Sequence, residues 1–165
     1  MPKHIEYRAF TVFYETITEE LTAPAKVSPG SPTGTLSDTD LIEVTSLWDT
    51  GAVRTCITPR LKNKLNLCVL DTSTTITGVG GEVKADIAMV NIRLMCDAEI
   101  IDFPVHVVDF PGDMDLLIGM DITGMGDFAV CNADGKTSFS FVIPPFPDRI
   151  NFADQADAAN KHSKT

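Results

Sequence analysis

The apolar residues of this chain alternate with polar ones or gather in short β-branched runs, and most runs end at Gly, Pro, Asp or Asn. Alternation with a period of two places apolar side chains on one face of an extended strand, and the flanking residues are turn formers. The pattern therefore predicts a mostly β fold. The expected strands are 7–14, 21–27, 41–48, 72–79, 82–95, 99–108, 128–132 and 137–143.

Two segments have helical rather than strand character. Thr58 can cap the free backbone N–H groups at the start of a helix, and Pro59 fits the first helical position. A second short helix is expected over 120–125, directly after the apolar strand-like segment 115–119. The chain should therefore contain one or two short helices among its strands.

Length and charge restrict the classes of function. A chain of 165 residues can bury one core of ordinary size, so one domain is expected. The net charge of −10 and the scattered basic residues argue against a nucleic acid or an anionic membrane surface as partner. The first twenty residues contain no apolar run of the kind that a secretory signal needs, and no later run is long enough to cross a bilayer.

The cysteines are widely separated and form no Cys-x-x-Cys motif, and no His stands at zinc-ligand spacing. They are Cys56, Cys68, Cys96 and Cys131. We interpret them as reduced and mostly buried, and we expect no metal site. A cytoplasmic location follows as the default.

Composition divides the chain into three regions. Residues 1–40 are expected to form an N-terminal extension with one or two strands and a turn-rich loop, as part of the same lobe. Residues 41–143 form the main domain. Residues 144–165 lose apolar periodicity and gain Ala, Asp, Asn and Lys, which predicts a mobile C-terminal tail.

The sharpest local motif is Asp49-Thr50-Gly51, which follows directly on the apolar strand that ends at Trp48. A strand that runs into a turn can present a carboxylate, and Gly51 lets the backbone fold back so that its N–H approaches that carboxylate. Thr50 can hydrogen-bond across a symmetric partner and so hold the geometry. Taken alone, however, these three residues are more typical of an ordinary Asx turn.

A second motif is the glycine-rich segment Gly78-Val79-Gly80-Gly81 between two long strand patterns. Glycines at the tip of an exposed hairpin let it swing and let its backbone lie against an extended peptide. A hairpin turn without function would have the same composition. A phosphate-binding loop is disfavoured, because neither Lys-Ser/Thr nor a helix pattern follows.

Taken together and in this order, the motifs resemble those of the retropepsin-like aspartic proteases, over residues 41–143. The family's catalytic turn is matched by Trp48-Asp49-Thr50-Gly51-Ala52, and its flap by the glycine-rich hairpin. Its element of two hydrophobic residues and a Gly, which packs beneath the catalytic loop, is matched by Leu117-Ile118-Gly119. The closing stretch, 126–141, looks most like bacterial members.

The resemblance implies a closed β-barrel-like lobe, one lobe per chain, and an aspartic endopeptidase. The chain holds a single Asp-Thr-Gly motif, so a homodimer is the simplest way to bring two Asp49 carboxylates together. These would share one proton and activate a water that attacks a peptide bond, without metal or cofactor. The hairpin would close over a peptide or protein substrate, and Ala52, Ile118 and Gly119 would support the turn.

Two positions depart from the viral pattern. Viral enzymes usually carry an Asp two residues beyond the catalytic Gly and an Arg just after the second Gly, and these two form an ion pair. Val53 and Met120 occupy these places here. Arg54 and Asp121 stand one residue further along in each case, and we hypothesise that they form a relocated ion pair.

The main alternative is a protein of the same fold that binds peptides or serves as a dimerisation module and hydrolyses nothing. The intact turn around Asp49 favours an enzyme, because a scaffold needs no carboxylate there. A histidine-based triad has little support, because His4, His106 and His162 have no local partner pattern. We interpret His106, which lies in an apolar strand, as a structural residue with satisfied hydrogen bonds.

Overall fold

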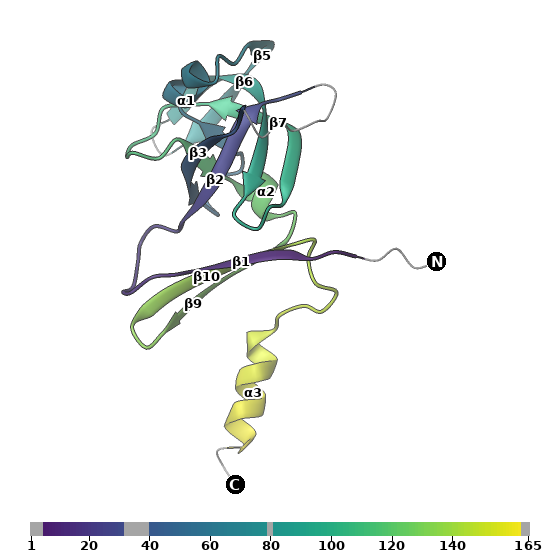
Figure 1. Cartoon of the computed structure of the whole chain (residues 1–165). Coiled ribbons are helices and arrows are strands. Elements are labelled where there is room, and N and C mark those ends of the chain that lie inside the picture. Colours follow the sequence, from purple (N-terminus) through teal and green to yellow (C-terminus); the bar gives the residue numbers. More distant parts are fainter. Residues whose placement is uncertain (1–4, 32–39, 79–80, 163–165) are drawn as a thin grey trace.

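The computed structural model of the chain describes residues 5–31, 40–78 and 81–162, and its centre is a closed β-barrel (Figure 1). The ring closes because β2 pairs with β6 as well as with β3. Two of the pairings, β3 with β8 and β4 with β7, are parallel. In order around the ring, the strands are β2 (Thr22–Pro29), β3 (Ile42–Trp48), β8 (Leu116–Ile118), β4 (Cys56–Ile57), β7 (Glu99–Val107) and β6 (Gly81–Leu94).

Two further groups of strands extend the barrel. β5 (Val69–Gly78) pairs with β6 and forms a long hairpin with it. A three-stranded antiparallel sheet in the order β1-β10-β9 lies across one end of the barrel (Figure 1). Its strands are β1 (Arg8–Phe13), β10 (Lys136–Ile143) and β9 (Asp127–Ala133). β1, from the N-terminal part of the chain, is thus paired with the last strand of the chain.

One hydrophobic core joins the barrel to the three-stranded sheet, and Trp48 lies at the junction. Its indole ring stacks on Phe128 at a centroid distance of 5.8 Å and an interplanar angle of 5°, and meets Phe141 at 4.9 Å. Such pairs contribute about 0.5–1.5 kcal/mol beyond the burial of their area. Trp48 is the last residue of β3, so these contacts anchor the strand end immediately before Asp49.

In the part of the chain that the structure describes, three helices accompany the strands: α1 (Pro59–Lys64), α2 (Met120–Thr123) and α3 (Phe152–His162). α1 and α2 lie where the sequence predicts helices, although α2 ends earlier than expected, with Gly124 as its C-cap. α3 lies in the segment 144–165, which the sequence predicts to be a mobile tail. Asn151 caps it, because its Oδ1 accepts hydrogen bonds from the N–H groups of Ala153 and Asp154.

The prediction of a mostly β fold with a closed-barrel lobe is confirmed. All eight strands expected from the alternation pattern are present, with ends shifted by a few residues. The two-residue strand β4 was not predicted, because it is too short to show alternation. Within the described ranges, no helix combines the length and the apolar character that crossing a membrane would require.

Candidate active site

The candidate catalytic turn begins where β3 ends, and β8 holds it in place. The Asp49 N–H donates to the Ile118 carbonyl oxygen at 3.0 Å, which continues the parallel pairing of Trp48 with Ile118. The Ala52 N–H then donates to the Asp49 carbonyl oxygen at 3.2 Å and closes the turn. The position of Asp49 therefore depends on a strand almost 70 residues further along the chain (Asp49 to Ile118).

The Asp49 carboxylate lies at the surface of the single chain. Its Oδ1 accepts a hydrogen bond from the Gly51 N–H at 2.8 Å, and no described residue donates to its Oδ2. Asp49 is half-buried, whereas Thr50 and Gly51 are exposed. A Cβ atom at position 51 would stand 3.1 Å from the Asp49 Oδ1, so a larger residue there would crowd the carboxylate. One carboxylate oxygen is thus fixed, and the other has no donor within the described chain.

Gly119 packs directly beneath the turn. Its N–H donates to the Thr55 Oγ1 at 3.1 Å, and the next N–H, of Met120, donates to the Ala52 carbonyl oxygen at 2.8 Å. A Cβ atom at position 119 would lie 2.6 Å from the carbonyl carbon of Arg54. The structure therefore brings Ala52, Ile118 and Gly119 together around Asp49.

The hypothesis of an Arg54–Asp121 ion pair is wrong for the single chain. The Asp121 carboxylate instead accepts hydrogen bonds from the Thr55 backbone N–H, at 2.9 and 3.0 Å, and from the Thr55 hydroxyl, at 2.6 Å. No ion pair joins Arg54 to Asp121 among the described residues, and Arg54 is exposed. Thr55, which is fully buried, is the residue that sequence reasoning missed. Its only signal is a hydroxyl residue that follows Val53 and Arg54 shortly after the turn.

The glycine-rich hairpin is formed by β5 and β6, and Gly78 pairs with Gly81 at its tip. Gly81 has a φ of +106°, a conformation that favours glycine. Val79 and Gly80 lie outside the described residues. Within the described residues, the hydrogen bonds of the Asp49 turn go to β8 and to the segment after it, and none goes to the hairpin.

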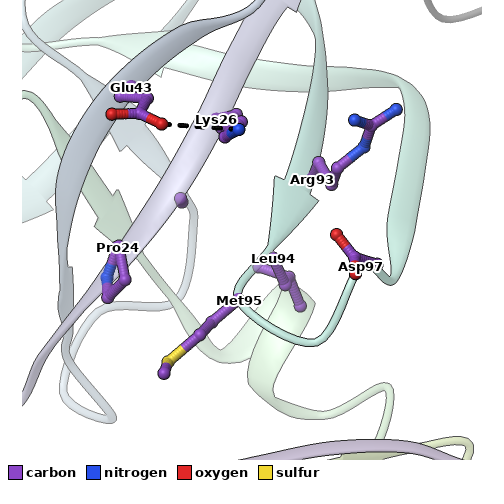
Figure 2. Close-up of a pocket in the computed structure, with 8 residues that line it drawn as sticks. Pro24, Lys26, Glu43, Arg93, Leu94, Met95 and Asp97 are labelled. Carbon is purple, nitrogen blue, oxygen red and sulfur yellow. Dashed lines mark ion pairs between the residues drawn. The ribbon is translucent and has the colours of Figure 1, made fainter. Parts of the chain in front are cut away.

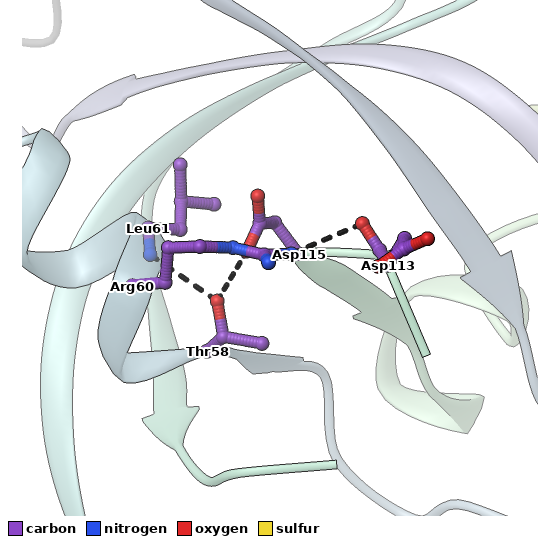
Figure 3. Close-up of polar contacts among 5 residues, drawn as sticks. All are labelled: Thr58, Arg60, Leu61, Asp113 and Asp115. Atoms are coloured by element: carbon purple, nitrogen blue, oxygen red, sulfur yellow. Dashed lines mark hydrogen bonds and ion pairs between the residues drawn. The ribbon is translucent and has the colours of Figure 1, made fainter. Parts of the chain in front are cut away.

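At the end of β8 that lies away from the turn, the start of α1 is tied to the start of the strand by a polar cluster (Figure 3). The Thr58 Oγ1 accepts from the Leu61 N–H at 3.2 Å and donates to the Asp115 Oδ1 at 2.5 Å. The Arg60 guanidinium pairs with the same carboxylate at 2.8 Å and also donates to the Asp113 carbonyl oxygen. Because the other end of β8 holds the catalytic turn through Ile118, this cluster stabilises the strand that supports the turn.

Replacing Thr58 with Val should lower the free energy of unfolding by about 1–2 kcal/mol, because the helix loses its cap and Asp115 loses a donor. Urea unfolding followed by circular dichroism measures the change. Thr45→Val, at an exposed position of β3, is the matched control and should change stability by less than about 0.5 kcal/mol. An equal effect of the two substitutions would contradict this role of Thr58.

Two other ionisable side chains near the turn do not form a nucleophilic site. Burial, together with the negative charge of Asp121, raises the pKa of Cys56 to about 11, so its thiol stays protonated and unreactive. Burial, and then the Arg54 charge, lowers the pKa of His106. The buried Nδ1 of His106 has no partner among the described residues, so the interpretation of satisfied hydrogen bonds is wrong.

The cysteines are all free thiols, but the expectation that they are mostly buried is wrong. Cys68 and Cys131 are exposed, and Cys56 and Cys96 are half-buried. Within the described ranges, no group of three or more His, Cys, Asp and Glu side chains could hold a metal ion.

A pocket of about 300 Å³ lies on another part of the barrel, between β2, β3 and the end of β6 (Figure 2). The Lys26–Glu43 ion pair, at 3.4 Å, lies on its wall. The lining residues are Pro24, Ala25, Lys26, Glu43, Arg93, Leu94, Met95 and Asp97. None belongs to the Asp49 turn or to the tip of the glycine-rich hairpin, because Arg93 and Leu94 lie at the far end of β6, so this pocket is not part of the candidate site.

Comparisons with known proteins agree with this geometry. A family model described as gag-polyprotein putative aspartyl protease matches residues 40–123. A retropepsin-like aspartic protease from Rickettsia conorii has a similar structure, with a TM-score of 0.54 and 16% identity over 84% of this chain and 96% of its own. The comparison with curated proteins gives no match.

Two further solved structures are similar over a smaller part of the chain. The EIAV protease, in complex with the inhibitor HBY-793, matches with a TM-score of 0.47 and 24% identity, over 64% of this chain and 86% of its own. The retroviral protease-like domain of Ddi1 from Leishmania major matches with a TM-score of 0.43 and 18% identity, over 68% of this chain and 82% of its own.

Proposed function

We propose that this chain hydrolyses peptide bonds as a homodimer with one shared active site. The premise is that the chain belongs to the gag-polyprotein putative aspartyl protease family and has the retropepsin-like fold. The observation that carries the proposal is the Asp49 carboxylate itself. It stands in an exposed turn with one oxygen held by the Gly51 N–H and the other without a donor in the described chain. A second copy of the same turn would complete the site.

Two Asp49 carboxylates within a few ångströms of each other do not both ionise readily, so the pair holds one proton. The ionised carboxylate removes a proton from a water placed between the two. The resulting hydroxide attacks the carbonyl carbon, while the protonated carboxyl donates its proton to the carbonyl oxygen. Proton transfer to the peptide nitrogen then breaks the C–N bond, and no covalent enzyme intermediate is formed.

The substrate in this proposal is an extended peptide segment. The hairpin of β5 and β6 presents glycine at its tip, Gly78 and Gly81, and a glycine backbone can approach a bound peptide closely. Its main-chain groups would hydrogen-bond the substrate in the manner of an added strand, and closure would exclude water. All the chemistry is assigned to the two carboxylates and one water, without a cofactor.

The proposal is tested by cleavage of a mixed peptide library from acidic to neutral pH, with wild type and the Asp49→Asn variant compared at equal concentration. New cleavage by the wild type, blocked by a transition-state peptide analogue such as pepstatin and absent in the variant, is the expected result. Equal cleavage by both proteins would show that Asp49 is not the catalyst. Folded, dimeric and inactive wild type would instead support a peptide-binding or dimerisation module.

A further inference from the structure

Two exposed apolar side chains lie beside the Asp49 turn, next to the exposed Arg54, although the chain carries a net charge of −10. Val53 follows Ala52 at the end of the turn and is 72% exposed, and Met120 is 43% exposed. The Met120 N–H donates to the Ala52 carbonyl oxygen at 2.8 Å, so both residues belong to backbone segments that touch beside the turn. In the single chain, Val53 and Met120 are therefore exposed apolar side chains beside the Asp49 turn.

In a two-fold dimer, the second copy of the chain would cover Val53 and Met120. If two Asp49 carboxylates approach within hydrogen-bond distance, the axis passes close to both turns, and exposed side chains beside each turn come to face the other copy. The buried centre of such an interface is poor in charge and rich in residues such as methionine. Repulsion between two acidic chains is also smallest where neither carries a charge.

An ion pair between the two copies through Asp121 fits the surface beside the Asp49 turn poorly. The nearby Asp121 carboxylate is bound within its own chain, because both of its oxygens accept hydrogen bonds from the backbone N–H or hydroxyl of Thr55. Arg54 then remains the charged residue beside Val53. An apolar contact therefore fits the exposed groups better than an electrostatic one.

We propose that Val53 and Met120 form an apolar contact with a second copy of the chain, and that this contact holds the two Asp49 turns together. The inference rests on the proposed function, because it starts from the pairing of two Asp49 carboxylates. It adds the residues that make the pairing stable. Each copy contributes the same two side chains, because the interface of a two-fold dimer is self-complementary.

The test measures the dimer dissociation constant by sedimentation equilibrium for Val53→Glu and Met120→Glu. Each variant places new negative charges near the axis and should raise the dissociation constant at least tenfold, with cleavage lost at low protein concentration and recovered at high concentration. Leu70→Glu, at a 44% exposed position of β5, is the matched control and should stay within twofold of wild type. Circular dichroism verifies folding.

Val53→Thr and Met120→Gln keep the size of the side chains, and they decide the question if a Glu variant does not fold. Together they should still raise the dissociation constant severalfold. If the dissociation constant is unchanged in the Glu variants or in the Val53→Thr and Met120→Gln variants, the proposed contact is wrong. If cleavage is lost while the dissociation constant is unchanged, these residues contact the substrate instead. The Asp49→Asn variant in the same cleavage assay separates the proposed function from the proposed contact. If this variant cleaves like wild type, the proposed function is wrong, and the dissociation constants still test the contact of Val53 and Met120.

Discussion

Replacement of Asp49 with Asn should lower kcat for peptide cleavage by at least about a thousandfold, because the pair loses both its base and its acid. Asparagine has nearly the same shape, and its side-chain oxygen can still accept the hydrogen bond that the Gly51 N–H makes to the Asp49 Oδ1. The turn should therefore keep its conformation. The loss of activity should appear in kcat with little change in the melting temperature.

Steady-state kinetics on a cleaved library peptide and thermal unfolding of the same samples measure the two effects. Asp71→Asn, at an exposed position of β5, removes the same charge elsewhere and should leave kcat within twofold. Comparable kcat values for the Asp49 variant and the wild type would remove Asp49 from the mechanism. A large fall in melting temperature would instead assign Asp49 a structural role.

The second large effect is expected at Gly119. An alanine Cβ there would lie 2.6 Å from the Arg54 carbonyl carbon and 2.7 Å from its oxygen, well inside van der Waals contact. The backbone of Arg54 must then move away, and with it the segment that follows the Asp49 turn. We expect Gly119→Ala to cost at least about 2 kcal/mol of unfolding free energy and to reduce cleavage in the protein that still folds.

Gly135→Ala separates this steric effect from the general cost of replacing glycine. Gly135 has a φ of +74°, and a Cβ atom there would meet nothing within 4 Å. Its substitution should cost about 1–2 kcal/mol for conformational reasons alone, and cleavage should persist. If Gly119→Ala is as stable and as active as wild type, Gly119 does not support the turn.

Local sequence patterns predict most of the strands, because alternation is a local property. They also predict the start of α1, because the cap at Thr58 involves the nearby Leu61 N–H. The order of strands around the barrel depends on contacts between distant segments, such as the parallel pairing of β3 with β8. A two-residue strand such as β4 carries no period at all.

The candidate site was partly predictable for the same reason. The motif around Asp49 is continuous in sequence, whereas the partner of Asp121 depends on which side chain the fold places beside it. Charge alone suggested Arg54, but the buried hydroxyl and N–H of Thr55 lie there instead. The role of Trp48 was equally hidden, because Phe128 and Phe141 come from the distant strands β9 and β10.

The central claim is that one active site needs an Asp49 from each of two chains, and mixing wild type with Asp49→Asn tests it most directly. Chains are mixed at equal concentration, allowed to exchange partners and assayed above the dimer dissociation constant. One carboxylate cannot act as both base and acid, so only the pairs of two wild-type chains should cleave, and activity per total chain should fall to about a quarter of the wild-type value. A fall to about half, as expected when each chain acts alone, would contradict the claim.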